Sequence, residues 1–216
     1  MTRAYVFDLD GTLLDTEIVW VEATHDYLLA KGHDVPREFA MSIVYGRSWT
    51  DVYADIVDAF PELDMGLLTM QAELDAFFYK VRGRADVRIP GSVALLRRLA
   101  KTAPCCIVSG SPRQHIADAV DIMDAAGEVA FYLGAEDYPF GKPHPSGFLM
   151  AADRFGVKPA NCVVFEDSAV GVAAGKAAGM KVVALALPLH PKQDVAAADL
   201  ILDDLAKFDP KVFDPA

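Results

Sequence analysis

The chain opens on a short apolar run, Ala4-Tyr5-Val6-Phe7, that ends abruptly in two carboxylates, Asp8 and Asp10. A continuous apolar run of this kind is typical of a strand buried on both faces of a parallel sheet. Side chains two residues apart on an extended segment point the same way, so both carboxylates can face one cavity. Because ligands of open α/β sheets bind outside the carboxyl ends of the strands, we expect the functional site at this point.

Strand-like and helix-like segments alternate from Pro90 onward, which predicts a parallel sheet covered by helices on both faces. The expected strands after the first are 105–108, 130–133, 162–165, 181–185 and an edge strand at 199–202. The expected helices are 92–101, 112–124, 145–155 and 169–178. The fold class is therefore α/β, with a Rossmann-like doubly wound parallel sheet as its core.

The segment between the first two strands has a helical pattern with no strand signal. Helices are expected over 17–31, 49–60 and 63–81, with a short one after Pro36; Thr16 and Ser48 are the expected N-caps and Gly32 the C′ residue. The first strand meets no partner until residue 105, so this segment interrupts the sheet. We expect residues 1–15 and 89–216 to form the catalytic core domain and 16–88 an inserted small helical-bundle cap domain.

Composition excludes several classes of protein. A chain of 216 residues, 53% of them hydrophobic, can bury about 70% of its unfolded surface and needs no metal or disulfide staple to fold. A net charge of −11 argues against nucleic acid or an anionic membrane as a partner. The sequence shows no signal peptide and no apolar run near the ~20 residues that span a bilayer, which predicts a cytoplasmic protein. The three cysteines, Cys105, Cys106 and Cys162, are expected as buried thiols.

Acids at two strand ends indicate the chemistry. Asp8 and Asp10 repel one another unless a cation separates them or one keeps its proton. An aspartate can attack phosphorus and carry the phosphoryl group, while a second carboxyl acts as acid and base. Glu166 and Asp167 end another apolar run, so four acids are expected at one sheet edge. Ligation by oxygen alone favours Mg²⁺ over zinc or copper.

Four motifs, in order along the chain, carry a resemblance to a known family: DLDGTLLDTE, Ser109-Gly110-Ser111, Gly141-Lys142-Pro143 and Glu166-Asp167-Ser168. They resemble the motifs of the haloacid dehalogenase superfamily, in its phosphatase and beta-phosphoglucomutase-like branch. The similarity covers essentially the whole chain. It implies an α/β core with a helical cap, hinged where the chain leaves and re-enters the core.

The resemblance also implies roles for the core residues. Asp8 is expected as the nucleophile and Asp10 as the general acid and base. Ser109 and the Gly110 backbone are expected to cradle the phosphate, and Lys142 to offset negative charge. The Mg²⁺ ligands are expected to be Asp8, Asp167 and the carbonyl of Asp10. Glu166 is expected to bind the ion through a water molecule, or to contact the ligands rather than the ion.

Each of the other candidates for substrate contact has an alternative structural role. Arg47 lies in a stretch that resembles the specificity loop of the family, yet a solvated arginine beside a helix start is an equal alternative. Glu17 and Trp20, early in the first cap helix, are candidates for the entrance, although tryptophans such as Trp20 and Trp49 are more often core residues than ligand platforms. His144 either approaches the substrate or merely packs in its loop.

These observations predict a Mg²⁺-dependent phosphatase that hydrolyses a small phosphorylated metabolite, a sugar or polyol phosphate, through an aspartyl phosphate, as a monomer or weak homodimer. A dehalogenase is disfavoured because it lacks the second acid that Asp10 supplies. One alternative is phosphoryl transfer of the beta-phosphoglucomutase type, although that family carries a histidine after the hinge where this chain has Ile18-Val19-Trp20. The other alternative is a non-catalytic protein that binds phosphorylated metabolites on the same fold.

Overall fold

A computed structural model describes residues 3–44, 47, 49–63, 65–83, 86–188, 190 and 192–214. The chain divides into two compact units, one made of Met1–Leu14 with Arg88–Ala216 and the other of Asp15–Val87. None of the described helices is long and apolar enough to cross a membrane.

The first unit is built on a six-stranded parallel sheet with the strand order β3-β2-β1-β4-β5-β6. The strands are β1 (Ala4–Phe7), β2 (Cys105–Val108), β3 (Val129–Leu133), β4 (Cys162–Glu166), β5 (Lys181–Leu185) and β6 (Leu200–Leu202). Five strands lie where the sequence predicts them to within one residue, and β6 is the expected edge strand. The predicted α/β fold with a doubly wound parallel sheet is confirmed.

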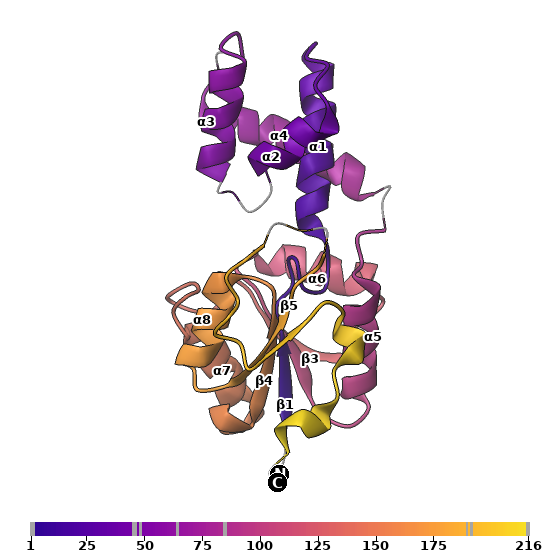
Figure 1. Cartoon of the computed structure of the whole chain (residues 1–216), viewed down its shortest axis with the longest axis vertical. Helices are drawn as coiled ribbons and strands as arrows, with labels where there is room; N and C mark the ends of the chain where they lie inside the picture. Colours follow the sequence, from indigo (N-terminus) through magenta and orange to yellow (C-terminus); the bar gives the residue numbers. More distant parts are fainter. Residues whose placement is uncertain are drawn as a thin grey trace. The chain divides into compact units, whose positions relative to one another are not determined.

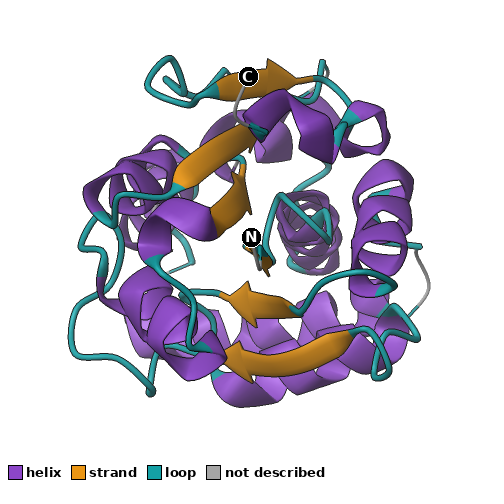
Figure 2. Ribbon diagram, turned by 90° about the horizontal axis from the view of Figure 1, so that it is seen from below, coloured by secondary structure: helices purple, strands orange, loops and turns teal. Residues whose placement is uncertain are grey.

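Helices cover both faces of this sheet (Figure 1). They are α5 (Pro90–Ala100), α6 (Arg113–Ile122), α7 (Ser146–Phe155) and α8 (Ala169–Ala177), with 3₁₀ turns η1 (Pro159–Asn161), η2 (Leu205–Lys207) and η3 (Pro210–Phe213). On one face, Phe148 of α7 and Val172 of α8 pack against a cluster that includes Val6 and Val164. On the other face, Phe165 stacks on Phe7 with ring centroids 4.5 Å apart. Figure 2 shows strands running across the view with helices to either side of them, and one strand at the outer edge.

The second unit consists of α1 (Thr16–Ala30), α2 (Arg37–Val44), α3 (Trp49–Ala59) and α4 (Leu67–Arg82). Its own apolar core includes Tyr27, Ile56 and Leu74, all fully buried. Trp20 and Trp49 pack against this core, as expected, and Trp20 stacks on Phe78 at 4.2 Å.

Helix ends in this unit differ from the sequence predictions in two places. Asp15, rather than Thr16, is the N-cap of α1, and its carboxylate accepts the N–H of Ile18 at 3.2 Å. Helix α4 begins at Leu67, four residues after the predicted start at Leu63. Leu63 is apolar because it packs in the core of this unit, although it lies before the helix. Gly32, with φ +95°, ends α1 as predicted. The predicted cap at residue 48 lies outside the described residues.

The cysteines confirm the expectation of buried thiols. Cys105, Cys106 and Cys162 are all free and buried. Burial raises the pKa of Cys105 to about 12 and that of Cys162 to about 11, so both stay protonated at neutral pH. They serve as small core residues.

Candidate active site

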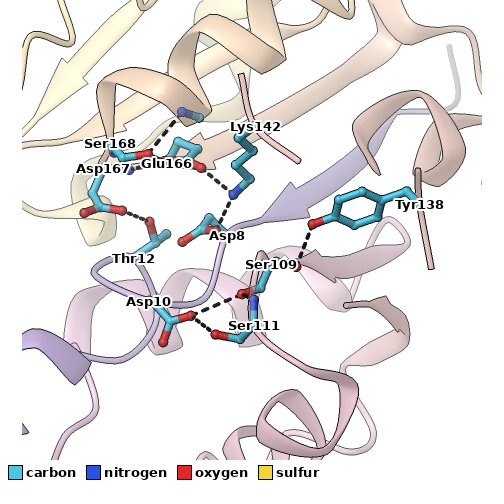
Figure 3. Close-up of polar contacts among 11 residues, drawn as sticks. Asp8, Asp10, Thr12, Ser109, Ser111, Tyr138, Lys142, Glu166, Asp167 and Ser168 are labelled. Carbon is cyan, nitrogen blue, oxygen red and sulfur yellow. Dashed lines mark hydrogen bonds and ion pairs between the residues drawn. The ribbon is translucent and has the colours of Figure 1, made fainter. Parts of the chain in front are cut away.

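The carboxyl ends of β1 and β4 form the centre of the site. These two strands are neighbours, with Phe7 opposite Phe165, and the N–H of Asp8 donates to the carbonyl of Phe165 at 2.9 Å. The strand order diverges here, because β2 lies on one side of β1 and β4 on the other. Such a switch point is where open α/β sheets bind ligands. Asp8 and Glu166 therefore emerge side by side from the sheet (Figure 3).

Three carboxylates meet at this point. Asp8, Glu166 and Asp167 each offer an oxygen, and these atoms lie within 4.8 Å of one another. Lys142 reaches them from its loop: its Nζ donates to Oδ1 of Asp8 and, at 2.5 Å, to Oε1 of Glu166. Asp8 and Glu166 are 6% and 1% exposed, so these charges interact with little screening by water.

The buried charges shift the protonation of the site. Burial lowers the pKa of Lys142, but the carboxylates of Asp8 and Glu166 raise it by more, so the ammonium stays charged. Burial raises the pKa of Asp8, Lys142 lowers it, and Glu166 and Asp167 raise it again, with a net result well above the ordinary value. Three acids beside one ammonium leave an excess of negative charge that further positive charge would relieve.

Glu166 is held by hydrogen bonds to both of its oxygens. Oε2 accepts the N–H groups of Asp167 and Ser168 and the Ser168 hydroxyl, each at 2.9 Å. Oε1 accepts from Lys142. The Ser168 hydroxyl also accepts the N–H of Gly171 at 3.1 Å, which caps α8. Glu166 is therefore a fixed anchor for Lys142.

Glycines make room for these carboxylates. A Cβ atom on Gly11, which has φ +81°, would overlap the carboxylate of Asp167. Thr12, in the same turn, donates its hydroxyl to Oδ1 of Asp167 at 3.0 Å. A Cβ atom on Gly171 would overlap the carboxylate of Glu166. Gly175, further along α8, instead allows close packing on the sheet, because a Cβ atom there would lie 2.8 Å from a side-chain atom of Val182.

Asp10 turns to a different set of partners. Its Oδ2 accepts the hydroxyl of Ser109 at 3.1 Å and that of Ser111 at 2.7 Å (Figure 3). The N–H of Ser111 donates to the Ser109 hydroxyl at 2.9 Å, and Tyr138 donates to the Ser109 carbonyl at 2.7 Å. The sequence reasoning did not single out Ser111; its place two residues after Ser109 was the available signal.

The donor set fits a hard divalent cation. The clustered carboxylates of Asp8, Glu166 and Asp167 make the oxygen-rich, negatively charged surroundings that Mg²⁺ prefers, and the backbone of Gly11 approaches Asp167 closely enough to exclude any side chain between them. The buried thiols lie within the strands and add no soft ligand to this group.

The other residues that the sequence predicts as substrate contacts are divided between the two units. Gly110 is exposed, and its Cβ position has open space around it. His144 is exposed, its Nδ1 is 2.6 Å from the Ser146 hydroxyl, and its ring lies 4.8 Å from that of Phe140. Arg47 and Glu17 belong to the second unit, where Arg47 forms an ion pair with Asp55 at 2.8 Å.

Comparisons with known proteins identify the family of this chain. The model of haloacid dehalogenase-like hydrolases matches residues 2–179, and the chain belongs to this family. A relative from Drosophila melanogaster, named "Probable pseudouridine-5'-phosphatase", is 35% identical over 96% of this chain and 92% of its own length. Hexitol phosphatase A of Escherichia coli is 28% identical over 95% of this chain and 93% of its own.

A solved structure is similar over nearly the same length. The structure of a haloacid dehalogenase family hydrolase from Deinococcus radiodurans, with bound phosphate and sodium, superposes with a TM-score of 0.73. It is 27% identical and covers 95% of this chain and 92% of its own. The resemblance seen in the four sequence motifs is therefore confirmed at the level of the family and the fold.

Proposed function

We propose that this protein is a Mg²⁺-dependent phosphatase that hydrolyses a small phosphorylated metabolite through an aspartyl phosphate on Asp8. The observation that carries the proposal is the group of Asp8, Glu166 and Asp167, in which Lys142 pairs with the buried Asp8 and Glu166, with a second acid, Asp10, two residues from Asp8. A binding protein has no need of a second acid held beside the first. The relatives named as phosphatases support the same class of reaction.

The first step forms the phosphoenzyme. A carboxylate oxygen of Asp8 attacks phosphorus, the bond between phosphorus and the alcohol oxygen breaks, and Asp10 gives its proton to that oxygen. Lys142 stays charged beside Asp8 and offsets negative charge as it develops on the phosphoryl group. The Ser109 hydroxyl and the backbone at Gly110 bind a phosphoryl oxygen at the start of the segment that leads into α6.

The second step releases phosphate. Asp10, now a carboxylate, takes a proton from water, whose oxygen attacks phosphorus and frees Asp8. Asp8, Asp167 and the Asp10 carbonyl would hold Mg²⁺, with Glu166 acting indirectly because Lys142, Ser168 and backbone N–H groups bond to its oxygens. When bound, the cation supplies positive charge that offsets repulsion between the phosphoryl oxygens and the carboxylates.

The proposed substrate class is a sugar or polyol phosphate. Hexitol phosphatase A, a relative across nearly the full length of this chain, supports a polyol phosphate, and the pseudouridine-5'-phosphatase relative supports a ribosyl phosphate. Residues 16–88 would act as a cap on the core, with Arg47, Glu17 and His144 proposed as substrate contacts.

A screen for released phosphate tests the proposal. The purified chain with Mg²⁺ is incubated with hexitol phosphates, sugar phosphates and pseudouridine 5'-phosphate, with p-nitrophenyl phosphate as a general substrate. We expect phosphate release from at least one metabolite, and none from the Asp8→Asn variant, which keeps the shape of the side chain but loses the nucleophile. Equal release by Asp8→Asn after clean preparation would overturn the proposal.

A further inference from the structure

We infer that Ser111 is a positioning residue that holds the general acid Asp10 in place during the reaction; this inference rests on the function proposed above. Its hydroxyl donates to Oδ2 of Asp10 at 2.7 Å, the shorter of the two hydroxyl contacts to that oxygen. Ser111 touches no reacting atom in this assignment and acts through Asp10.

Two hydroxyl groups donate to the same carboxylate oxygen of Asp10. Oδ2 of Asp10 accepts the hydroxyls of both Ser109 and Ser111, and these two bonds occupy its two lone pairs. The same two bonds fix the rotation of the carboxyl group, so that Oδ1 keeps one direction.

The number of hydroxyl protons separates the roles of the two serines. Ser109 has one such proton, and its oxygen already accepts the N–H of Ser111 at 2.9 Å. When Ser109 donates to the substrate phosphate, as proposed, it can no longer donate to Asp10. Ser111 then remains as the hydroxyl donor to Oδ2 while the proton is transferred.

The backbone of Ser111 is held in place by the loop that follows β3. Its carbonyl accepts the N–H of Ala135 at 3.1 Å, and a Cβ atom on Gly134 would come within 2.9 Å of that carbonyl oxygen. Such a fixed backbone loses little further freedom when the side chain bonds to Asp10. This support is what an acid needs if its direction is to stay constant from one turnover to the next.

The test compares two substrates of nearly the same shape, p-nitrophenyl phosphate and phenyl phosphate, whose leaving groups differ in their need for a proton. The ratio kcat/KM reports events up to the release of the alcohol, and so the acid step. For Ser111→Ala we expect kcat/KM to fall about tenfold on phenyl phosphate and less than about twofold on p-nitrophenyl phosphate, the size of one charge-assisted hydrogen bond. Ser111→Thr should restore most of the loss, and Ser42→Ala, which removes an exposed hydroxyl bonded to Phe39, should match wild type.

A double-mutant cycle completes the test. In an Asp10→Asn background, the rate is measured as single-turnover release of phenol. Ser111→Ala should cause no further loss of rate there, because Ser111 acts only through Asp10 and both changes remove the same contribution. Equal losses on the two substrates, or a loss that persists in the Asp10→Asn background, would overturn the inference while leaving the phosphatase function intact. If wild type releases phosphate from no substrate at all, the proposed function fails, and this inference fails with it.

Discussion

The carboxylate of Glu166 occupies the space that a side chain at Gly171 would fill. The absence of a side chain at Gly171 in α8 therefore allows Glu166 to lie where it binds Lys142. We predict that Gly171→Ala lowers phosphatase activity by about 10²-fold or more, because displacing Glu166 moves the Lys142 ammonium that stabilises charge on the phosphoryl group. Alanine normally favours a helix over glycine by roughly 0.5–1 kcal/mol, so any loss of stability here reports the clash. Activity and urea unfolding together measure both effects.

Gly127→Ala is the matched control for this change. Its Cβ position has no atom within 4 Å, and the residue lies in the turn before β3, away from the site. We expect it to retain wild-type activity. If Gly171→Ala is equally active, Glu166 is not a required anchor.

Asp10→Asn removes the proton donor and the base while keeping the nucleophile. General acid and base groups contribute about 10²–10⁴-fold, so turnover should fall by that order. With p-nitrophenyl phosphate the first step needs little acid, and phosphoenzyme should accumulate because no base activates water. Intact-protein mass spectrometry would measure the bound phosphoryl group, and Asp8→Asn/Asp10→Asn should carry none. Phosphate on that double variant would remove Asp8 from its role.

Removal of divalent metal should abolish activity. Asp8, Glu166 and Asp167 form an oxygen-only group, so Mg²⁺ should restore turnover after EDTA, manganese or cobalt in part, and calcium should inhibit because it favours a larger shell. Thr12→Val removes the hydroxyl bonded to Asp167 and should raise the half-saturating Mg²⁺ concentration by about tenfold or more. Thr69→Val, on the exposed side of α4, should leave it unchanged. Full turnover in excess EDTA would contradict this prediction.

The sequence predicted the elements of the site that depend on local pattern. Asp8 and Glu166 each end a continuous apolar run, and a buried parallel strand leaves only one edge for both. The predicted start of α4 was wrong because Leu63 is apolar for another reason: it is buried in the core of the second unit without being part of the helix. The spacing of apolar residues does not distinguish these two cases. Ser111 and Gly171 were missed as site residues because their importance arises from contacts with Asp10 and Glu166, which only the folded chain brings within reach.

Asp199 should make stability depend on pH. Its carboxylate accepts Lys176 at 2.7 Å and the N–H of Val182 at 2.8 Å, which ties the start of β6 to β5. Burial raises the pKa of Asp199, but these hydrogen bonds lower it by more. Because the folded pKa lies below the unfolded one, the stabilisation is present above about pH 4 and is lost as pH falls through the folded pKa.

We therefore predict that Asp199→Asn loses about 1–2 kcal/mol of unfolding free energy at neutral pH, allowing for the part-exposed lysine, and that the gap closes below about pH 4. Urea unfolding of both proteins across this pH range measures the gap. Asp203→Asn, which breaks an exposed pair with Lys207, is the control and should show little change. A gap that stays constant with pH would mean that the side chain acts by shape alone.

The last prediction separates a hydrolase from a mutase by the fate of the aspartyl phosphate. A mutase must keep this intermediate until the sugar binds again, so water has to be excluded and a second anion contact has to hold the distal phosphate. In this chain Trp20 stacks on Phe78 within the second unit, and Arg47 is paired with Asp55, which offsets its charge. Neither arrangement favours retention of a bisphosphate, and we expect water to attack first. Incubation with beta-glucose 1-phosphate and a trace of glucose 1,6-bisphosphate should give inorganic phosphate, where that sugar is accepted, and little glucose 6-phosphate. If glucose 6-phosphate forms much faster than phosphate is released, the chain is a mutase, and Asp55→Asn becomes the informative variant because it leaves Arg47 to bind the distal phosphate.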